Sequence, residues 1–219
     1  MLPARIAGFV DGFNLYHAVD GLGQHHLKWL NLRALCEQFA PAPQFTLDAI
    51  YYFSAYATWR TDAYARHREY IRALSSAGVT PVLGRFKGKF RACYSCGKRW
   101  TDHEEKETDV NLALYLLREA YRNSYDRALL ITGDSDIVPA VRMVLEQFPN
   151  KQFRIFAPPG RQYSMDLVSA AGGLKNARKL QQIHLSRALF PLHVRDETGK
   201  VIATRPAKYA PPEEEQPMS

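Results

Sequence analysis

The sequence predicts an α/β fold built on a mainly parallel sheet. Short apolar runs typical of buried strands alternate along the chain with longer segments of helical periodicity, and most of the runs end in turn or polar residues. The chain has 219 residues, of which 46% are hydrophobic, which suffices for one domain with a full core. We expect this domain to span residues 1–195. Residues 196–219, rich in proline and glutamate, are expected to form a flexible polar tail.

The individual elements follow from their patterns and end signals. Asn31 and Ser164 are expected to cap helices, Gly78 to end one, and Pro139 fits the first turn of another, where its missing N–H does no harm. Residues 17–30 show no regular pattern. The expected strands are residues 5–10, 48–55, 79–83, 126–132 and 153–157, and the expected helices begin near residues 31, 61, 107, 136 and 164, with a last helical stretch over residues 175–183.

Acidic residues follow two of the expected strands. Asp11 comes directly after residues 5–10, and Asp134 and Asp136 come after the fourth strand. Asp109 opens the helix that precedes the fourth strand, on the same face as its apolar residues. Ligands bind an open parallel sheet outside the carboxyl ends of its strands, where the strand order reverses. If the first and fourth strands are neighbours at that point, these four carboxylates converge.

Such a cluster needs a counter-charge. Several carboxylates at one point repel one another and raise each other's pKa. A hard cation bound through oxygen, Mg²⁺ or Mn²⁺, relieves this repulsion and can activate water against a phosphodiester. Singly, each aspartate could be a helix cap or a turn residue. Together, at two strand ends and a helix start, they favour a metal site.

Three segments carry a resemblance to a known family. Residues 9–15, 105–114 and 131–136 resemble, in order and spacing, the motifs of the NYN domain family, in particular its LabA-like branch of the PIN-like nucleases. The resemblance implies a PIN-like three-layer α/β/α sandwich and metal-dependent cleavage of RNA, for which single-stranded RNA is the expected substrate. By position it implies an acidic catalytic and metal-binding cluster of Asp11, Asp109, Asp134 and Asp136, with Asn14, Ser54 and Ser135 in supporting places.

Other functions use similar residues. Haloacid-dehalogenase-like phosphatases need a second aspartate two residues after the first, and Phe13 occupies that position here. An RNA-binding module without cleavage would gain nothing from a negative pocket. The acidic site could also serve small-molecule chemistry, and the sequence leaves that alternative open.

Residues 85–103 form an insertion that breaks the strand–helix rhythm. Cys93 and Cys96 have the spacing of half a zinc knuckle, and His103 is near enough in sequence to be a third ligand. A water, another histidine or a second subunit could supply the fourth, so a homodimer stays open. An unligated pair or a redox couple are the alternatives.

Basic and aromatic residues alternate through the same insertion. They could bind phosphates and stack on unpaired bases of RNA, or they could be an ordinary surface loop with buried aromatic residues. The formal net charge of +7, from 29 basic and 22 acidic residues, fits a polyanionic partner and simple solubility equally well. The expected RNA-binding residues are Lys87, Lys89, Arg91, Lys98, Arg99 and Trp100.

The sequence also bears on location. No apolar run approaches the ~20 residues of a membrane helix, and the start of the chain does not resemble a secretory signal. Three cysteines do not suggest a disulfide framework. We therefore expect a cytoplasmic protein with reduced thiols and no membrane partner.

Overall fold

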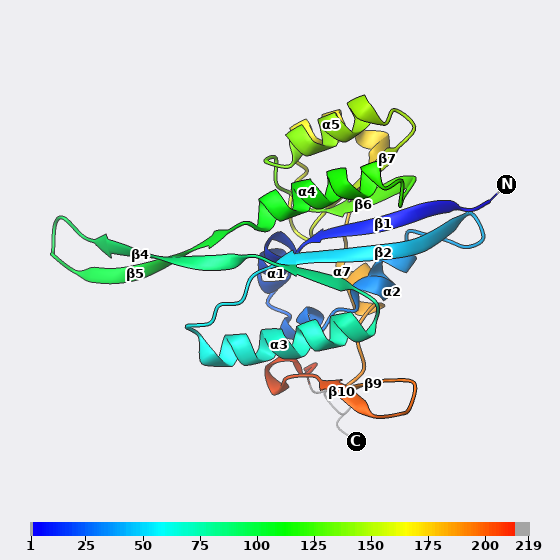
Figure 1. Ribbon diagram of the computed structural model, residues 1–219. Helices are drawn as coiled ribbons and strands as arrows, with labels where there is room; N and C mark the ends of the chain where they lie inside the picture. Colours follow the sequence, from blue (N-terminus) through cyan, green and yellow to red (C-terminus); the bar gives the residue numbers. More distant parts are fainter. Residues whose placement is uncertain (1, 213–219) are drawn as a thin grey trace, which may run out of the picture.

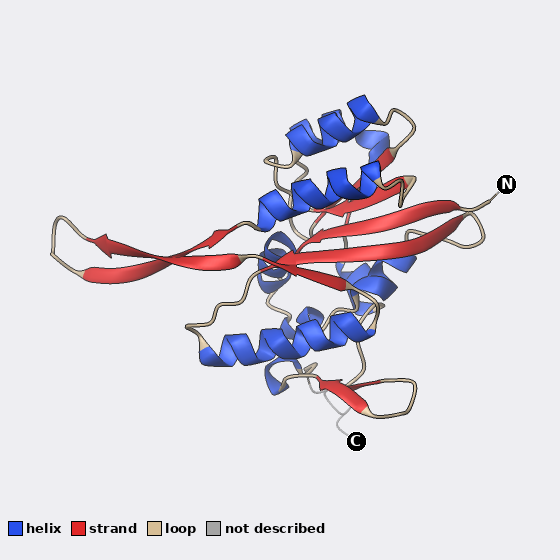
Figure 2. Cartoon of the chain, viewed as in Figure 1, coloured by secondary structure: helices blue, strands red, loops and turns tan. Residues whose placement is uncertain are grey.

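The computed structural model describes residues 2–212 and has three layers, with a central sheet between two layers of helices (Figures 1 and 2). The sheet has six strands in the order β3-β2-β1-β6-β7-β8, and every neighbouring pair is parallel. The predicted α/β fold is confirmed. The strands are β1 (Ala4–Asp11), β2 (Phe45–Ser54), β3 (Thr80–Leu83), β6 (Arg127–Ile131), β7 (Gln152–Ala157) and β8 (Ala177–Lys179).

Each face of the sheet has its own core because successive strand residues point to opposite sides. In β1, Ile6 and Val10 belong to one core, while Ala7 and Phe9 belong to the other. Helices α4 (Thr108–Tyr121), α5 (Val138–Gln147) and α6 (Met165–Ala170) cover the face of Ala7 and Phe9. Helices α1 (Gly12–Asp20), α2 (Leu32–Glu37), α3 (Thr61–Ser76) and α7 (Gln182–Ser186) cover the opposite face.

The strand order reverses between β1 and β6, which is the arrangement on which the expected convergence of the acids depends. Val10 pairs with Ile131 at the carboxyl ends of these two strands, β2 and β3 follow on one side, and β7 and β8 follow on the other. The segments that begin at Asp11 and Thr132 therefore leave the sheet side by side. This places Asp11, at the end of β1, and Asp134, shortly after β6, at one site.

The insertion forms a twisted antiparallel hairpin that extends away from the body of the protein (Figures 1 and 2). Its strands are β4 (Arg85–Ala92) and β5 (Arg99–Lys106). Lys87 faces Glu104 across the hairpin and Lys89 faces Asp102, so acidic residues interleave with the basic ones. The sequence pattern of alternating basic and aromatic residues did not indicate this pairing.

Two stretches differ from the sequence-based elements. In residues 17–30, α1 continues to Asp20 and a 3-10 helix covers His25–Lys28. In residues 175–183, the expected helix is wrong: a 3-10 turn (Leu174–Asn176) leads into edge strand β8. The hydrogen bonds of β8 come from β7, a distant segment that local periodicity does not reveal.

The expected flexible tail is wrong for residues 201–209. Strands β9 (His193–Arg195) and β10 (Val201–Thr204) form a hairpin against α3, and Tyr209 is only 7% exposed. Arg72 donates to the Ile202 carbonyl at 2.6 Å, which ties β10 to α3. Residues 213–219 of the expected tail lie outside the described residues. Between residues 2 and 212, no helix is long and apolar enough to cross a membrane.

Gly12 is fixed by close packing where β1 passes into α1. A Cβ on Gly12 would lie 2.5 Å from the Phe53 carbonyl oxygen and 2.7 Å from the Tyr52 ring. Gly12→Ala is therefore expected to lower the free energy of unfolding by about 1–3 kcal/mol, measured by urea denaturation. Gly21→Ala, just past the other end of the same helix, is the control, since its Cβ would have only ordinary contacts at 3.4 Å. Equal denaturation midpoints for the two variants would refute this view of Gly12.

Candidate active site

An open pocket of about 530 Å³ lies at the carboxyl ends of β1 and β6. It brings together three of the predicted aspartates, Asp11, Asp109 and Asp134, with a fourth acid, Glu105. We call it the acidic pocket. Its remaining lining residues are Phe13, Asn14, His17, Gly133, Arg161 and Gln162.

Asp11 is the most buried of these acids, at 4% exposure. It caps α1, because its Oδ1 accepts a hydrogen bond from the Asn14 amide at 2.9 Å. Its Oδ2 accepts a hydrogen bond from the Thr132 hydroxyl at 2.8 Å. Burial raises the pKa of Asp11, and the neighbouring Asp134 and Glu105 raise it further. Asp11 is thus a helix cap and a member of the acidic pocket at once.

Two bridging side chains tie the strand ends together. Thr132 donates to Asp11 and accepts a hydrogen bond from the Asp134 amide at 3.0 Å. Asn14, predicted as a supporting residue, accepts from the Gly133 amide at 3.0 Å. These bonds fix the two acidic segments relative to each other. Thr132 was not predicted as a site residue, because its only signal in the sequence was its place between an apolar strand and Asp134.

Asp109 carries the clearest electrostatic sign of crowding. Partial burial raises its pKa to about 6, and Asp11 and Asp134 contribute next in importance. Glu105 adds to this shift and is held in place by Thr108, whose amide donates to Glu105 Oε1 at 3.0 Å and whose hydroxyl contacts the same oxygen. Glu105 was missed because it belongs to the hairpin, and only the structure shows where β5 ends.

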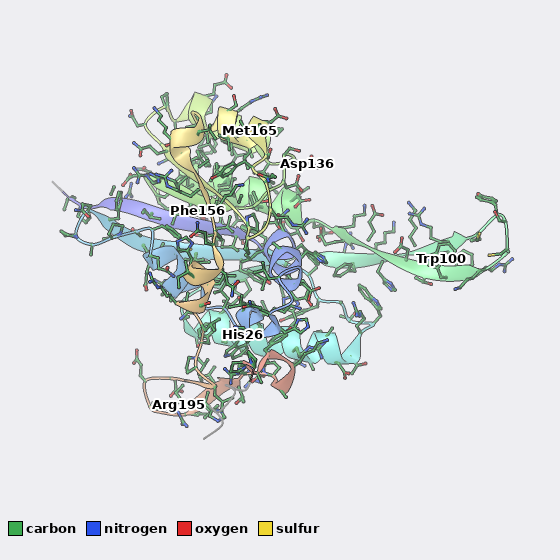
Figure 3. All side chains as sticks on the ribbon, turned by 180° about the vertical axis from the view of Figure 1, so that it is seen from behind. His26, Trp100, Asp136, Phe156, Met165 and Arg195 are labelled. Carbon is green, nitrogen blue, oxygen red and sulfur yellow. The ribbon has the colours of Figure 1, made fainter. Side chains whose placement is uncertain are left out.

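Three predicted site residues lie elsewhere. Ser135 and Asp136 are exposed in the turn before α5 and do not line the acidic pocket, although Asp136 adds to the raised pKa of Asp109 (Figure 3 labels Asp136). The chain bends there because the Val138 amide bonds to the Ser135 carbonyl at 3.0 Å. Ser54 lines a neighbouring cavity of about 300 Å³, which we call the aromatic cavity. The rings of Tyr16, Tyr52, Trp59, Tyr70, Phe86 and Tyr209 form much of its wall.

The acidic pocket has the donor set of a hard cation. All four acids offer carboxylate oxygens, which Mg²⁺ and Mn²⁺ prefer. Across residues 2–212, no three His, Cys, Asp or Glu side chains already stand close enough together to hold a metal ion. The acids therefore line one pocket without forming a preformed set of metal ligands.

The structure does not bring His103, the predicted third zinc ligand, to the two cysteines. Cys93 and Cys96 lie at the tip of the hairpin, just beyond the pairing of Ala92 with Arg99. His103 pairs with Gly88, four positions or about 13 Å back along the strands. Its ring stacks on Trp59 with centroids 3.6 Å apart and planes at 6°. His103 therefore helps to fix the base of the hairpin.

Comparison with known proteins identifies the family. The model of the NYN domain matches residues 5–173, which is most of the chain. The chain belongs to the NYN domain family. This membership confirms the resemblance of the sequence motifs and, with the parallel sheet, the PIN-like fold. It also indicates a PIN-like nuclease domain.

Two proteins are similar to this NYN domain. 6-Hydroxy-3-succinoylpyridine 3-monooxygenase HspA of Pseudomonas putida (strain DSM 28022 / S16) is 27% identical over 177 residues, which cover 65% of this chain and 56% of that protein. The crystal structure of VPA0982 from Vibrio parahaemolyticus RIMD 2210633, a protein of unknown function, superposes with a TM-score of 0.54 at 18% identity. That match covers 86% of this chain and 97% of the other, and supports the fold alone.

Proposed function

We propose that this NYN domain is a ribonuclease that depends on a divalent metal ion. The observation that carries the proposal is the meeting of Asp11, Asp109 and Asp134 in one pocket where the strand order reverses. Partial burial, followed by the neighbouring carboxylates, raises the pKa of Asp109 to about 6, and a bound cation would relieve the repulsion among these acids. The nuclease family of the chain favours a phosphodiester as the substrate.

Several residues in and around the acidic pocket have distinct parts in this proposal. Asp11, Asp109 and Asp134 would hold Mg²⁺ or Mn²⁺, which supplies a Lewis acid and lowers the pKa of bound water. Thr132 and Asn14 keep Asp11 and Asp134 in place through the hydrogen bonds described above. Asp136, Ser135 and Glu105 add charge or polar groups near the pocket. At the rim, Arg161 offers a positive charge to a phosphate of the substrate.

The hairpin offers a surface for the RNA. Seven basic residues stand against three acidic ones over residues 85–106, so the hairpin is positive in spite of its internal pairing. Phe90, Tyr94 and Trp100 are exposed there, which suits stacking on unpaired bases (Figure 3 labels Trp100). We propose single-stranded RNA as the substrate. The residues proposed to contact it are Lys87, Lys89, Arg91, Lys98, Arg99 and Trp100.

A paired assay tests the proposed activity. End-labelled single-stranded RNA and p-nitrophenyl phosphate are offered side by side, with Mn²⁺ or with EDTA. We expect RNA fragments with Mn²⁺ only, and no release of p-nitrophenol. Release of p-nitrophenol without RNA fragments would indicate a phosphatase. RNA retained in a gel-shift assay but never cut would indicate a binding module.

A second candidate function is chemistry on a small aromatic acid. It is favoured by the aromatic cavity, which shares Phe13 and His17 with the acidic pocket. The Pseudomonas relative is named as a monooxygenase of a substituted pyridine. The test is to incubate the protein with a hydroxypyridine carboxylic acid, NADH and oxygen, and to follow the addition of one oxygen atom by mass spectrometry. An unchanged mass would exclude this candidate for the compounds tried.

We further propose that Cys93 and Cys96 bind zinc together with the same pair from a second copy of the chain. Hydrogen bonds from the Cys96 and Ser95 amides lower the pKa of Cys93, which favours the thiolate that zinc requires. A structural site needs four ligands, and one tip supplies two. We expect about half a zinc ion per chain and a dimer by light scattering, both lost in Cys93→Ser. A monomer without zinc, after purification free of chelator, would refute this.

A further inference from the structure

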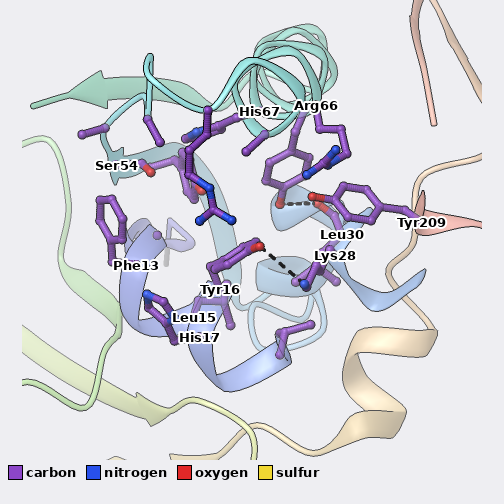
Figure 4. Close-up of a pocket in the computed structure, with 18 of the residues that line it drawn as sticks. Phe13, Leu15, Tyr16, His17, Lys28, Leu30, Ser54, Arg66, His67 and Tyr209 are labelled. Carbon is purple, nitrogen blue, oxygen red and sulfur yellow. Dashed lines mark hydrogen bonds between the residues drawn. The ribbon is translucent and has the colours of Figure 1, made fainter. Parts of the chain in front are cut away.

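The aromatic cavity lies between α1 and α3 (Figure 4). Phe13 and His17 line both this cavity and the acidic pocket, so the two spaces adjoin at these side chains. Tyr70 donates to the Leu30 carbonyl at 2.8 Å, which fixes part of the cavity wall. The volume of about 300 Å³ lies at the lower end of the range of small-ligand pockets. The proposed cleavage of phosphodiesters does not itself require such a cavity.

The charges around the cavity are of one sign. Between residues 2 and 212, no aspartate or glutamate lines it, whereas Lys28, Arg60 and Arg66 do. The Lys28 ammonium is compensated, because it forms an ion pair with Asp20. Arg60 and Arg66 form no ion pair with any described carboxylate. Two uncompensated guanidinium groups therefore border an apolar space.

His67 adds polarity to the wall without adding charge. Burial lowers the pKa of His67 to about 4, so its ring is neutral at pH 7. Its buried Nε2 has no hydrogen-bond partner among the described residues. The rings of Tyr52 and Tyr56 pack against it edge-on, at centroid distances of 6.3 and 5.0 Å. The His67 ring therefore adds no positive charge to that of Arg60 and Arg66.

The aromatic walls and the arginines together suit a ligand that has both a flat ring and a negative charge. Aromatic walls favour a flat ring, which they bury in offset or edge-to-face contacts. Guanidinium groups bind carboxylates and phosphates and can also stack on a ring. A purely apolar ligand would leave the arginines unused, and a lone phosphate would leave the rings uncovered. We propose that the aromatic cavity binds a planar aromatic group that carries a negative charge, with the anionic part at Arg60 or Arg66.

Two sources have this chemistry. One is an unstacked base of RNA with its phosphate, which the shared residues Phe13 and His17 would place beside the acidic pocket; this source rests on the proposed ribonuclease function. The other is a free aromatic acid. Binding measurements in EDTA separate this question from cleavage, because they leave the acidic pocket without metal.

Isothermal titration of the full chain in EDTA tests the proposal. We expect adenosine 5′-monophosphate or benzoate to bind about tenfold or more tightly than adenosine, which lacks the charge, or ribose 5-phosphate, which lacks the ring. Ala63→Trp should fill the cavity and abolish binding, since Ala63 lines it. Ala65→Trp is the matched control, as Ala65 is exposed on the same helix and lies outside the lining. The double variant Arg60→Gln, Arg66→Gln gives a second test should Ala63→Trp fail to fold.

The outcomes distinguish the sources. Binding of the nucleotide that is lost in Ala63→Trp and kept in Ala65→Trp supports an RNA base, and binding of benzoate alone supports a free acid. Binding retained in Asp134→Asn would show that the cavity acts independently of the acidic pocket, even if no RNA is cut. No binding of either ligand, or equal binding by Ala63→Trp and the unaltered protein, would overturn the proposal.

Discussion

Asp134→Asn is expected to lower the rate of RNA cleavage by about 100-fold or more while the protein stays folded. Replacing a carboxylate ligand by a neutral amide weakens metal binding, and even a residue that merely supports a ligand contributes about 10–100-fold. The asparagine Oδ1 can still accept the hydrogen bond from the Asp136 amide, which is 2.9 Å long in the parent. Asp134 is thus a cleaner position than Asp11, whose two oxygens both accept structural hydrogen bonds.

The control for this variant is Asp48→Asn. Asp48 is exposed on β2, and its substitution makes the same charge change outside the acidic pocket. Cleavage is measured with labelled RNA and Mn²⁺, and folding by thermal denaturation. Full activity of purified Asp134→Asn would remove Asp134 from the metal site, and equal losses in both variants would point to an effect of charge alone.

Cleavage at limiting Mn²⁺ is expected to fall about tenfold between pH 7 and pH 5. The carboxylate of Asp109 must lose its proton to bind a cation, and its pKa is raised to about 6 by burial and by Asp11 and Asp134. The ionised fraction of Asp109 therefore drops across this interval. Excess Mn²⁺ competes with the proton and should move the midpoint to lower pH. A midpoint near pH 4 at every Mn²⁺ concentration would contradict the crowding of these acids.

The same shift predicts the stability of the metal-free protein. Because the pKa of Asp109 is higher in the folded than in the unfolded chain, the unfolded chain ionises first as the pH rises, and stability is lost between about pH 4 and pH 6. Asp109→Asn should recover about 1 kcal/mol at pH 7 in EDTA, after allowance for solvent screening, or about 2–4 °C in Tm. Added Mn²⁺ should stabilise the parent more than Asp109→Asn. A lower Tm for this variant in EDTA would show that Asp109 is not under repulsion.

Much of the fold could be predicted from short sequence patterns. Asn31 and Ser164 cap α2 and α6 as predicted, because an N-cap depends on hydrogen bonds to residues two or three positions away. The apolar runs predicted the parallel strands, and the general rule for ligand sites in open sheets suggested that β1 and β6 are neighbours. Edge strand β8 was not predictable in this way, because three residues carry no periodicity and β7 supplies their partners.

For the site, too, features that depend on local sequence could be predicted, and features that depend on distant segments could not. That Asp11, Asp109 and Asp134 meet in one pocket could be predicted because strand ends and helix starts can be located in sequence; their role stays a prediction. Asp136 was misplaced because its position depends on how the chain bends after β6. His103 was misjudged because its stacking partner, Trp59, is remote in sequence. The aromatic cavity combines residues from segments far apart along the chain, so only the folded structure could reveal it.

Anomalous diffraction from a crystal soaked in Mn²⁺ tests most directly whether the aspartates of the acidic pocket bind a divalent metal ion. We expect a manganese peak in the acidic pocket, in contact with Asp11, Asp109 and Asp134, and its loss in crystals of Asp134→Asn. An acidic pocket without manganese, in crystals of a preparation that cleaves RNA in a Mn²⁺-dependent manner, would contradict the assignment of these three aspartates.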